Sequence, residues 1–73
     1  MQNEHIEKDK ELGHQIQKLR KRAHLTQDKL AEKADITMKY MQFIESARRT
    51  PSLHTMYNLA KALKMKVKDI FPF

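Results

Sequence analysis

Apolar side chains recur along this chain at intervals of three and four residues, the period of an amphipathic α-helix. The first such stripe follows Asp9, a suitable N-cap, and consists of Leu12, Ile16, Leu19 and Ala23. It predicts a helix of about four turns. Residues 1–8 are polar and precede the stripe, so we expect a flexible acidic tail there and one domain over residues 9–73.

Three further helices are each introduced by a hydroxyl residue that can cap a first turn. Thr26, Thr37 and Ser52 precede helices expected over residues 27–34, 38–45 and 53–63. The residues expected to face the core are Leu30, Ala31, Ala34, Met41, Ile44, Leu53, Met56, Leu59, Ala60 and Leu63. A last short turn over 67–71 ends at Pro72. No segment shows the alternation of a strand, so the predicted fold is all-α and compact, with five helices.

The second and third predicted helices are joined by a connector of about three residues, as in a helix-turn-helix unit, which presents its second helix to the DNA major groove. The first turn of that second helix contains Met38, Lys39 and Tyr40, with no acid among them. Its free amides and the positive end of its dipole are therefore open to a phosphate or a base edge. The arrangement predicts DNA binding.

The formal net charge of +6 is unevenly distributed along the chain. Residues 1–11 hold two Lys against four acids, whereas residues 12–50 hold nine Lys and Arg against four acids. A basic body behind an acidic tip is typical of proteins that bind polyanions, although lysine-rich solvated helix faces produce the same excess. Charge alone therefore favours nucleic acid only modestly.

Composition excludes several other classes of protein. With no cysteine, the 73 residues offer no disulfide, thiolate zinc site or thiol nucleophile. The four histidines do not pair at a spacing of three or four, and no glycine-rich phosphate loop is present, so we expect no metal, no cofactor, no small-molecule substrate and no enzymatic activity. No apolar run reaches the roughly 18 residues of a membrane span and the N-terminus is unlike a signal peptide, which predicts a cytoplasmic protein without membrane partners.

A set of short motifs keeps a constant order and spacing over about residues 12–71. The motifs are Thr26-Gln27-Asp28-Lys29-Leu30-Ala31, Ala34-Asp35-Ile36-Thr37, Tyr40-Met41, Ile44-Glu45, Arg48-Arg49-Thr50-Pro51-Ser52-Leu53 and Leu59-Ala60-Lys61-Ala62-Leu63. Together they resemble the Cro and phage-repressor type of helix-turn-helix family, which includes restriction-modification controller proteins. The resemblance implies a five-helix, lambda-repressor-like domain, bacterial or phage-encoded. It also implies a homodimer on double-stranded DNA, acting as a repressor or autoregulatory controller.

The resemblance also implies roles for individual residues. Base contacts fall on Met38, Lys39, Gln42 and Phe43, and phosphate contacts on Thr26, Gln27, Thr37, Tyr40, Ser46, Arg48 and Arg49. An ion pair that supports the scaffold joins Arg20 to Glu45. The residue types suit these roles, since Gln42 can both donate to and accept from adenine and Lys39 can donate to guanine. Phe43 is bulky for the groove, and packing over the domain surface or against a dimer mate is an equal alternative for it.

The C-terminal third holds more large apolar residues than the fourth helix needs, namely Tyr57, Met65, Ile70, Phe71 and Phe73. We expect a two-fold dimer through the fourth and fifth helices that binds a pseudo-palindromic operator, the alternative being that these side chains close the monomer core. A second function, of another class, is a protein-interaction module on the same fold, such as an antitoxin bound to a toxin partner.

Four turns depart from the resembled family, which most often has glycine there. This chain has His24, Asp35, Ala47 and Lys64 at these positions. A left-handed backbone at Ala47 or Lys64 costs about 1 kcal/mol, whereas Asp and His tolerate it better. We therefore expect the loop after the third helix to be reshaped.

Overall fold

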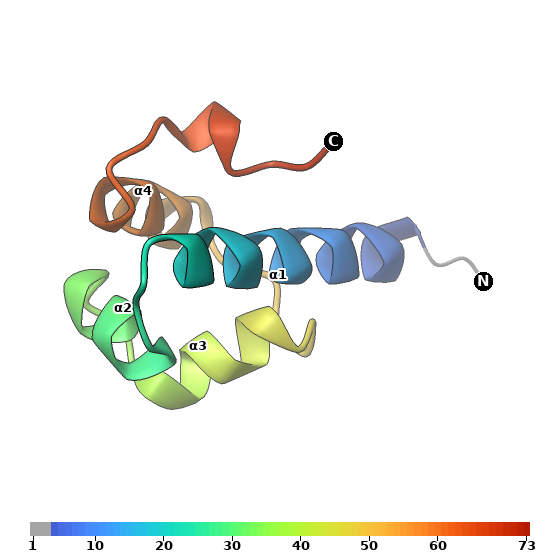
Figure 1. The fold of residues 1–73 in the computed structure, drawn as a ribbon. Helices are drawn as coiled ribbons and strands as arrows, with labels where there is room; N and C mark the ends of the chain where they lie inside the picture. The colour runs from blue at the N-terminus through green and yellow to red at the C-terminus, as the bar shows by residue number, and fades with distance from the viewer. Residues whose placement is uncertain (1–3) are drawn as a thin grey trace.

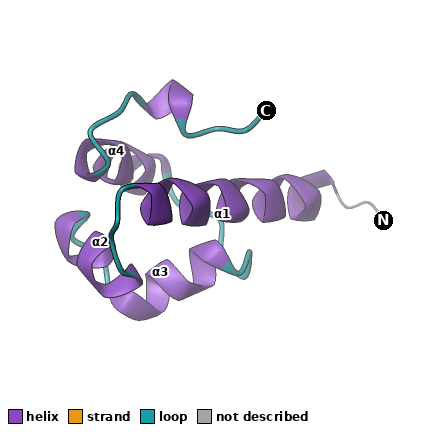
Figure 2. Cartoon of the chain, in the orientation of Figure 1, coloured by secondary structure: helices purple, strands orange, loops and turns teal. Residues whose placement is uncertain are grey.

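The structure is a computed structural model that describes residues 4–73, with side chains from residue 7 onward. Its elements, drawn in Figures 1 and 2, are α1 (Glu4–Arg22), α2 (Gln27–Lys33), α3 (Met38–Glu45), α4 (Leu53–Ala62) and a short 3₁₀ helix, η1 (Val67–Asp69). The all-α prediction is confirmed, since residues 4–73 contain no strand. The short fifth helix expected over residues 67–71 is a single 3₁₀ turn, so residues 4–73 contain four α-helices and not five.

The helices form layers around α1. Figure 1 shows α1 across the middle of the molecule, with α4 and η1 on one side and α2 and α3 on the other. α3 packs against both α1 and α2, while α4 packs against α2 and η1. The radius of gyration is 11.3 Å. No helix within residues 4–73 combines the length and the apolar character needed to cross a membrane.

The core contains most of the predicted apolar stripe residues. Its fully buried large side chains are Ile16, Leu30, Met41, Ile44, Leu59 and Ile70. Two predictions of core residues are wrong: Leu53 is 62% exposed and Ala23 lies at the surface. Leu53 is the first residue of α4 and Ala23 follows the last residue of α1, so both lie at the margin of the predicted stripes.

Helix α1 begins earlier than the sequence pattern predicts. It starts at Glu4, so Asp9 lies inside the helix and is not its N-cap. The Asp9 carboxylate accepts a hydrogen bond from the Thr50 hydroxyl instead, at 2.7 Å. Residues 1–3 of the expected flexible tail lie outside the described residues, and residues 4–8 belong to α1.

All four turns that lack the expected glycine keep the left-handed backbone. The φ angles are 62° at His24, 59° at Asp35, 65° at Ala47 and 58° at Lys64. Each of these residues follows the end of an α-helix, and in each case its amide and the next amide donate to carbonyls of the last turn. At α3 these bonds are Ala47 N to Ile44 O (3.1 Å) and Arg48 N to Phe43 O (2.8 Å).

This pattern, in which two amides just after a helix donate to carbonyls three and five residues earlier, is the Schellman motif. It satisfies helix carbonyls that would otherwise lack a partner, which offsets the cost of the left-handed conformation. The expectation that the loop after α3 is reshaped is therefore wrong for its first residues.

The single glycine of the chain permits a close approach between two helices. Gly13 lies in α1 and is buried against the C-terminal end of α3. A Cβ atom at this position would lie 2.5 Å from the Ile44 carbonyl oxygen and 2.9 Å from that of Glu45. Because such distances are too short for any side chain, glycine at residue 13 fixes how closely α1 and α3 pack.

Candidate nucleic-acid interface

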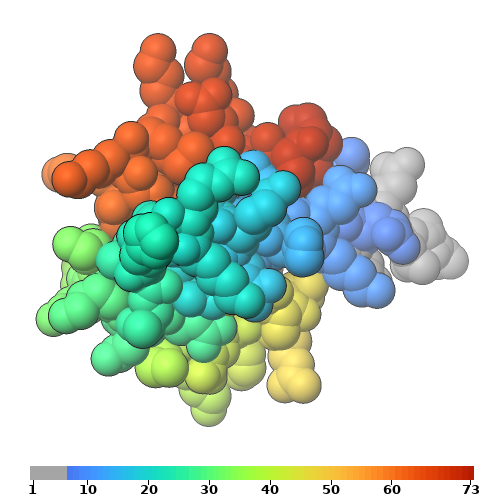
Figure 3. Space-filling view, in the orientation of Figure 1, coloured from blue at the N-terminus to red at the C-terminus, as the bar shows by residue number. Residues whose placement is uncertain are grey.

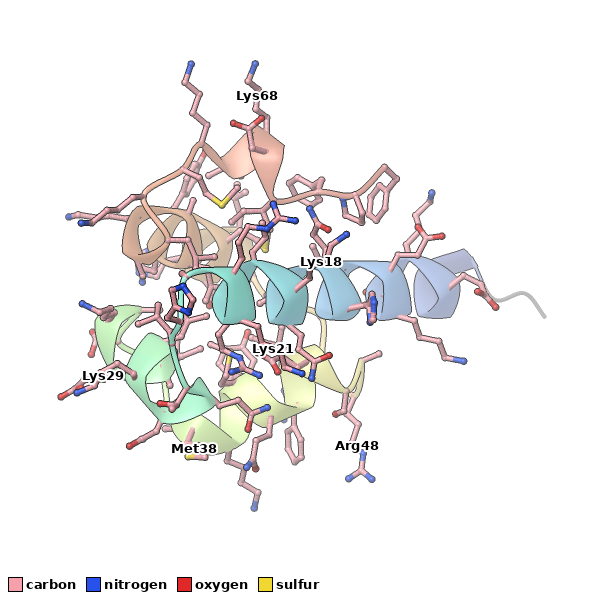
Figure 4. All side chains as sticks on the ribbon, viewed as in Figure 1. Lys18, Lys21, Lys29, Met38, Arg48 and Lys68 are labelled. Carbon is pink, nitrogen blue, oxygen red and sulfur yellow. The ribbon has the colours of Figure 1, made fainter. Side chains whose placement is uncertain are left out.

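Helix α3 is anchored on one side and exposed on the other. Met41 and Ile44 are buried in the core, whereas Met38, Lys39 and Gln42 are exposed, Met38 at 41%. Figure 4 shows Met38 on the lower side of the molecule, on the same side as Arg48 and opposite Lys68. The resemblance assigned Met38, Lys39 and Gln42 to base contacts. In the structure these three residues lie together on the exposed face of α3.

The start of α3 is open to an anion. The Thr37 hydroxyl oxygen caps the helix by accepting a hydrogen bond from the Tyr40 amide at 3.0 Å. The first turn holds no acid. Thr26 caps α2 in the same way through the amide of Lys29, also at 3.0 Å. Both hydroxyl groups are exposed and keep a hydrogen that they can donate to a phosphate oxygen.

Phe43 lies beside the exposed face of α3. Its ring is half-buried, and the Lys39 ammonium lies 5.9 Å from the ring centroid, within range of a weak cation–π interaction. The ring helps to line a surface hollow of about 520 Å³ together with Ile36, Thr37, Lys39, Tyr40 and Arg49. Phe43 therefore packs partly over the domain surface, which was one of the alternatives left open for it.

The loop after α3 presents two cationic side chains to solvent. Ser46, Arg48 and Arg49 are all exposed. The backbone amides of both arginines donate to the Phe43 carbonyl, at 2.8 and 3.2 Å, so these amides are not free to hold a phosphate. Their guanidinium groups remain available for that contact. Figure 3 shows α3 and this loop along one edge of the molecule, with the C-terminal segment on the opposite edge.

A buried polar network connects α3 to α1 and α2. Arg20 and Glu45 form the expected ion pair, with Nε to Oε2 at 2.7 Å and side-chain exposures of 9% and 3%. Arg20 also donates from Nη2 to Glu45 Oε1 (3.2 Å) and from Nη1 to the Leu25 carbonyl (2.9 Å). The carboxylate accepts a further bond from Gln27 Nε2 at 2.9 Å. Every buried polar atom among the described side chains has a partner, so this network holds α3 in a fixed orientation.

Gln27 is thus part of the network as well as a candidate phosphate ligand. One of its two amide hydrogens is directed to Glu45, which leaves the second hydrogen free. Tyr40 has a similar double position, because its hydroxyl oxygen accepts a bond from the Ser52 amide at 3.3 Å and keeps its own hydrogen. The structure gives both side chains a role inside the protein that the sequence did not indicate.

The residues expected at a dimer interface divide into three groups. Tyr57 and Phe73 are each 56% exposed, and Met65 and Phe71 are half-buried. Ile70 is 0% exposed, so its assignment to an interface is wrong: η1 turns this side chain into the monomer core. Leu53, which the sequence placed in the core, is exposed one turn before Tyr57 on α4.

Sequence reasoning predicted the Arg20–Glu45 pair but missed two other contacts that α1 makes at or just beyond the end of α3. The Asp9–Thr50 hydrogen bond joins residues 41 positions apart, and Gly13 faces the carbonyls of Ile44 and Glu45. A solitary glycine within an otherwise regular helical pattern was the available signal for close packing. No local sequence pattern indicates the Asp9–Thr50 pair, because its members are 41 positions apart.

The fold and this exposed, capped α3 define a helix-turn-helix protein. The helix-turn-helix family profile matches residues 16–70, about three quarters of the chain. The chain therefore belongs to the helix-turn-helix family, whose members are DNA-binding transcription regulators, and the resemblance seen in the sequence is confirmed.

Individual relatives agree with this assignment. An immunity repressor protein of Bacillus phage phi105 is 42% identical over 81% of this chain. The matched region covers 41% of the length of that repressor. A protein of Archaeoglobus fulgidus named as an uncharacterized HTH-type transcriptional regulator is 31% identical, with 80% of this chain and 82% of the relative covered. The restriction-modification controller protein C.AhdI from Aeromonas hydrophila has a similar structure, with a TM-score of 0.85 and 27% identity over 86% of this chain and 96% of that one.

Proposed function

We propose that this protein is a transcriptional regulator that recognises a specific sequence in double-stranded DNA through α3. The observation that carries the proposal is the division of α3 into a buried side, held by Met41, Ile44 and the Arg20–Glu45 pair, and an exposed side of Met38, Lys39 and Gln42. A helix held in this way can enter the major groove without reorganising. The protein would act by occupying its site on DNA.

The exposed side chains divide by chemistry into readers and anchors. Gln42 and Lys39 carry the hydrogen-bonding groups that distinguish adenine and guanine, and Met38 offers an apolar contact to a thymine methyl group. Phosphates would be held by the cap hydroxyls of Thr26 and Thr37, by Gln27, Tyr40 and Ser46, and by the guanidinium groups of Arg48 and Arg49. Phosphate contacts set the position of the protein on DNA, and base contacts set its sequence preference.

We further propose that the protein binds as a homodimer through α4 and the C-terminal segment. Leu53 and Tyr57 are large, exposed and one helical turn apart on α4. In the C-terminal segment Phe73 is exposed, and Met65 and Phe71 are half-buried. A two-fold dimer would place its two α3 helices about 34 Å apart, one turn of B-DNA. The operator would then be a pseudo-palindrome, and a regulator bound there would block polymerase or contact it.

Selection of bound duplexes from a random pool tests the proposal most directly. A recovered palindrome with half-sites one helical turn apart is the expected result, since a two-fold dimer imposes its symmetry on the site. No enrichment of any sequence would contradict sequence-specific recognition and would favour a protein-interaction module on the same fold.

Three single substitutions distinguish the contributions of base contacts, phosphate contacts and overall positive charge to DNA affinity. Gln42→Ala should cost about 1–3 kcal/mol on the selected site and relax the preference at one base position. Arg49→Ala should weaken binding to all sequences alike. Lys68→Ala removes the same charge from the opposite side of the molecule (Figure 4) and should have a much smaller effect. Equal losses for Gln42→Ala on selected and random DNA would refute its reader role.

Salt dependence and association state complete the test. A dimer with about 6–10 phosphate contacts should lose about 10³–10⁵ in affinity between 50 and 200 mM salt. Sedimentation should show a dimer at micromolar concentration, and a protein that remains monomeric at high micromolar concentration would contradict the homodimer.

A further inference from the structure

The first half of α1 contacts the loop that carries Arg48 and Arg49. Asp9, in the second turn of α1, accepts a hydrogen bond at Oδ2 from Oγ1 of Thr50, at 2.7 Å. Thr50 directly follows the two arginines. The bond is exposed to solvent, but it is short and of the charge-assisted kind, since its acceptor is a carboxylate. The loop is therefore attached to a helix outside the helix-turn-helix pair.

Among the described residues, the other hydrogen bonds that tie this loop to the helix before it all involve α3 itself. At its start, the amides of Arg48 and Arg49 donate to the Phe43 carbonyl. At its end, the Ser52 amide donates to the Tyr40 hydroxyl at 3.3 Å. Thr50 lies between these two attachments, and its hydrogen bond to Asp9 ties the loop to α1.

Asp9 belongs to a stripe of α1 that follows the end of α3. Asp9, Gly13 and Arg20 are separated by four and seven residues, which places them on one face of the helix. Gly13 lies against the carbonyls of Ile44 and Glu45, and Arg20 pairs with Glu45. Asp9 extends the same contact beyond α3 to its loop. Asp9 lies outside residues 16–70, the part that matches the family.

We infer that Asp9 is a positioning residue for DNA binding: through Thr50 it holds the loop in place so that Arg48 and Arg49 reach the phosphates without first being ordered. This inference rests on the proposed function. A carboxylate beside a phosphate-binding loop repels DNA, so charge and positioning act in opposite directions at Asp9. Removing Asp9 should therefore strengthen DNA binding if charge repulsion dominates and weaken it if positioning dominates.

The experiment measures the affinity of the full chain for the selected duplex and for a random duplex. Asp9→Ala and Thr50→Val both remove the hydrogen bond and should weaken binding to both duplexes by about threefold to tenfold, the cost of ordering one or two side chains. Asp9→Ala should do so although it makes the protein more basic. The double variant should bind no more weakly than the weaker single variant, because the two changes break one interaction.

Two conservative variants and one charge control complete the set. Asp9→Asn and Thr50→Ser keep an acceptor and a hydroxyl donor, and each should bind at least as tightly as the wild type. Glu11→Ala removes an exposed acid from the same part of α1 and should leave binding unchanged or tighten it. If Asp9→Ala binds as tightly as Glu11→Ala, positioning by Asp9 is refuted.

The salt dependence tests whether the variants keep their phosphate contacts. Because Arg48 and Arg49 still reach the phosphates once the loop is ordered, the slope of log affinity against log salt concentration should stay the same in Asp9→Ala and Thr50→Val. A slope that falls by about 0.9 for each contact in both variants would overturn the inference, because the contacts themselves would then be lost. A wild-type protein that binds neither duplex would overturn the proposed function, and the inference with it, whereas wild-type binding with unaffected variants overturns the inference alone.

Discussion

Replacing Gly13 with alanine tests how closely α1 packs against α3. Helix propensity alone predicts that the change is stabilising, because alanine in a helix interior is favoured over glycine by about 0.8–1.0 kcal/mol. The tertiary structure predicts the opposite. The new Cβ would lie 2.5 Å from the Ile44 carbonyl oxygen and 2.9 Å from the Glu45 carbonyl oxygen.

The magnitude follows from the nature of the contacted atoms. Ordinary contacts between carbon and carbonyl oxygen are about 3.3–3.6 Å long, so α1 and α3 must move apart by several tenths of an ångström or more. Backbone oxygens cannot rotate away as the end of a side chain can. Overpacking of this kind costs about 1–3 kcal/mol. With the cost near the upper end, and after subtracting the gain in propensity, we expect a net loss of about 1–2 kcal/mol.

Thermal unfolding followed by helical circular dichroism measures this loss. For a domain of this size 1 kcal/mol corresponds to about 4–8 °C, so the Tm of Gly13→Ala should fall by about 5–15 °C. His14→Ala is the matched control, because His14 is exposed in the same helix and gains propensity without meeting α3. A Gly13→Ala protein as stable as the wild type, or more stable, would refute the close packing of α1 on α3.

Four further predictions concern the free energy of unfolding and, for the last variant, dimerisation. Ala47→Gly should stabilise the protein by about 0.5–1 kcal/mol in urea unfolding, since glycine adopts φ of 65° without steric cost, and a loss of stability would contradict the left-handed turn. Glu45→Ala should cost about 3–5 kcal/mol because Arg20, 9% exposed, is left buried without its partner; a loss below 1 kcal/mol would show that the pair is solvated. Ile70→Ala should cost about 2–5 kcal/mol from cavity formation, whereas Tyr57→Ala should weaken dimerisation in sedimentation without lowering Tm.

Local features were predictable from the sequence because their causes lie within a few residues. The three cap residues Thr26, Thr37 and Ser52 each accept a bond from an amide three positions later, as predicted. The bounds of α3 follow from its cap and from the residues after it, and they match the expectation at both ends. The ion pair between Arg20 and Glu45 came from resemblance to a family, since no local rule joins residues 25 positions apart.

The predictions that failed concern residues whose surroundings come from distant parts of the chain. Leu53 and Ile70 are both apolar, and only the path of the chain after α4 decides which one is covered. Asp9 had the chemistry of an N-cap, but α1 continues past it toward the N-terminus and its carboxylate meets Thr50.

The sequence by itself determined the existence of the four α-helices, the caps of the last three, the basic character and the membership of the helix-turn-helix family, because these depend on periodicity, short-range hydrogen bonds and motif spacing. Only the tertiary structure showed the roles of the single glycine and of the four turns that lack one. The single glycine at residue 13 lies where α1 approaches the end of α3 closely, and four turns kept a left-handed backbone without glycine. The physical reason is that steric exclusion and hydrogen bonding between α1 and the end of α3 depend on distances between segments, which appear only once the chain is folded.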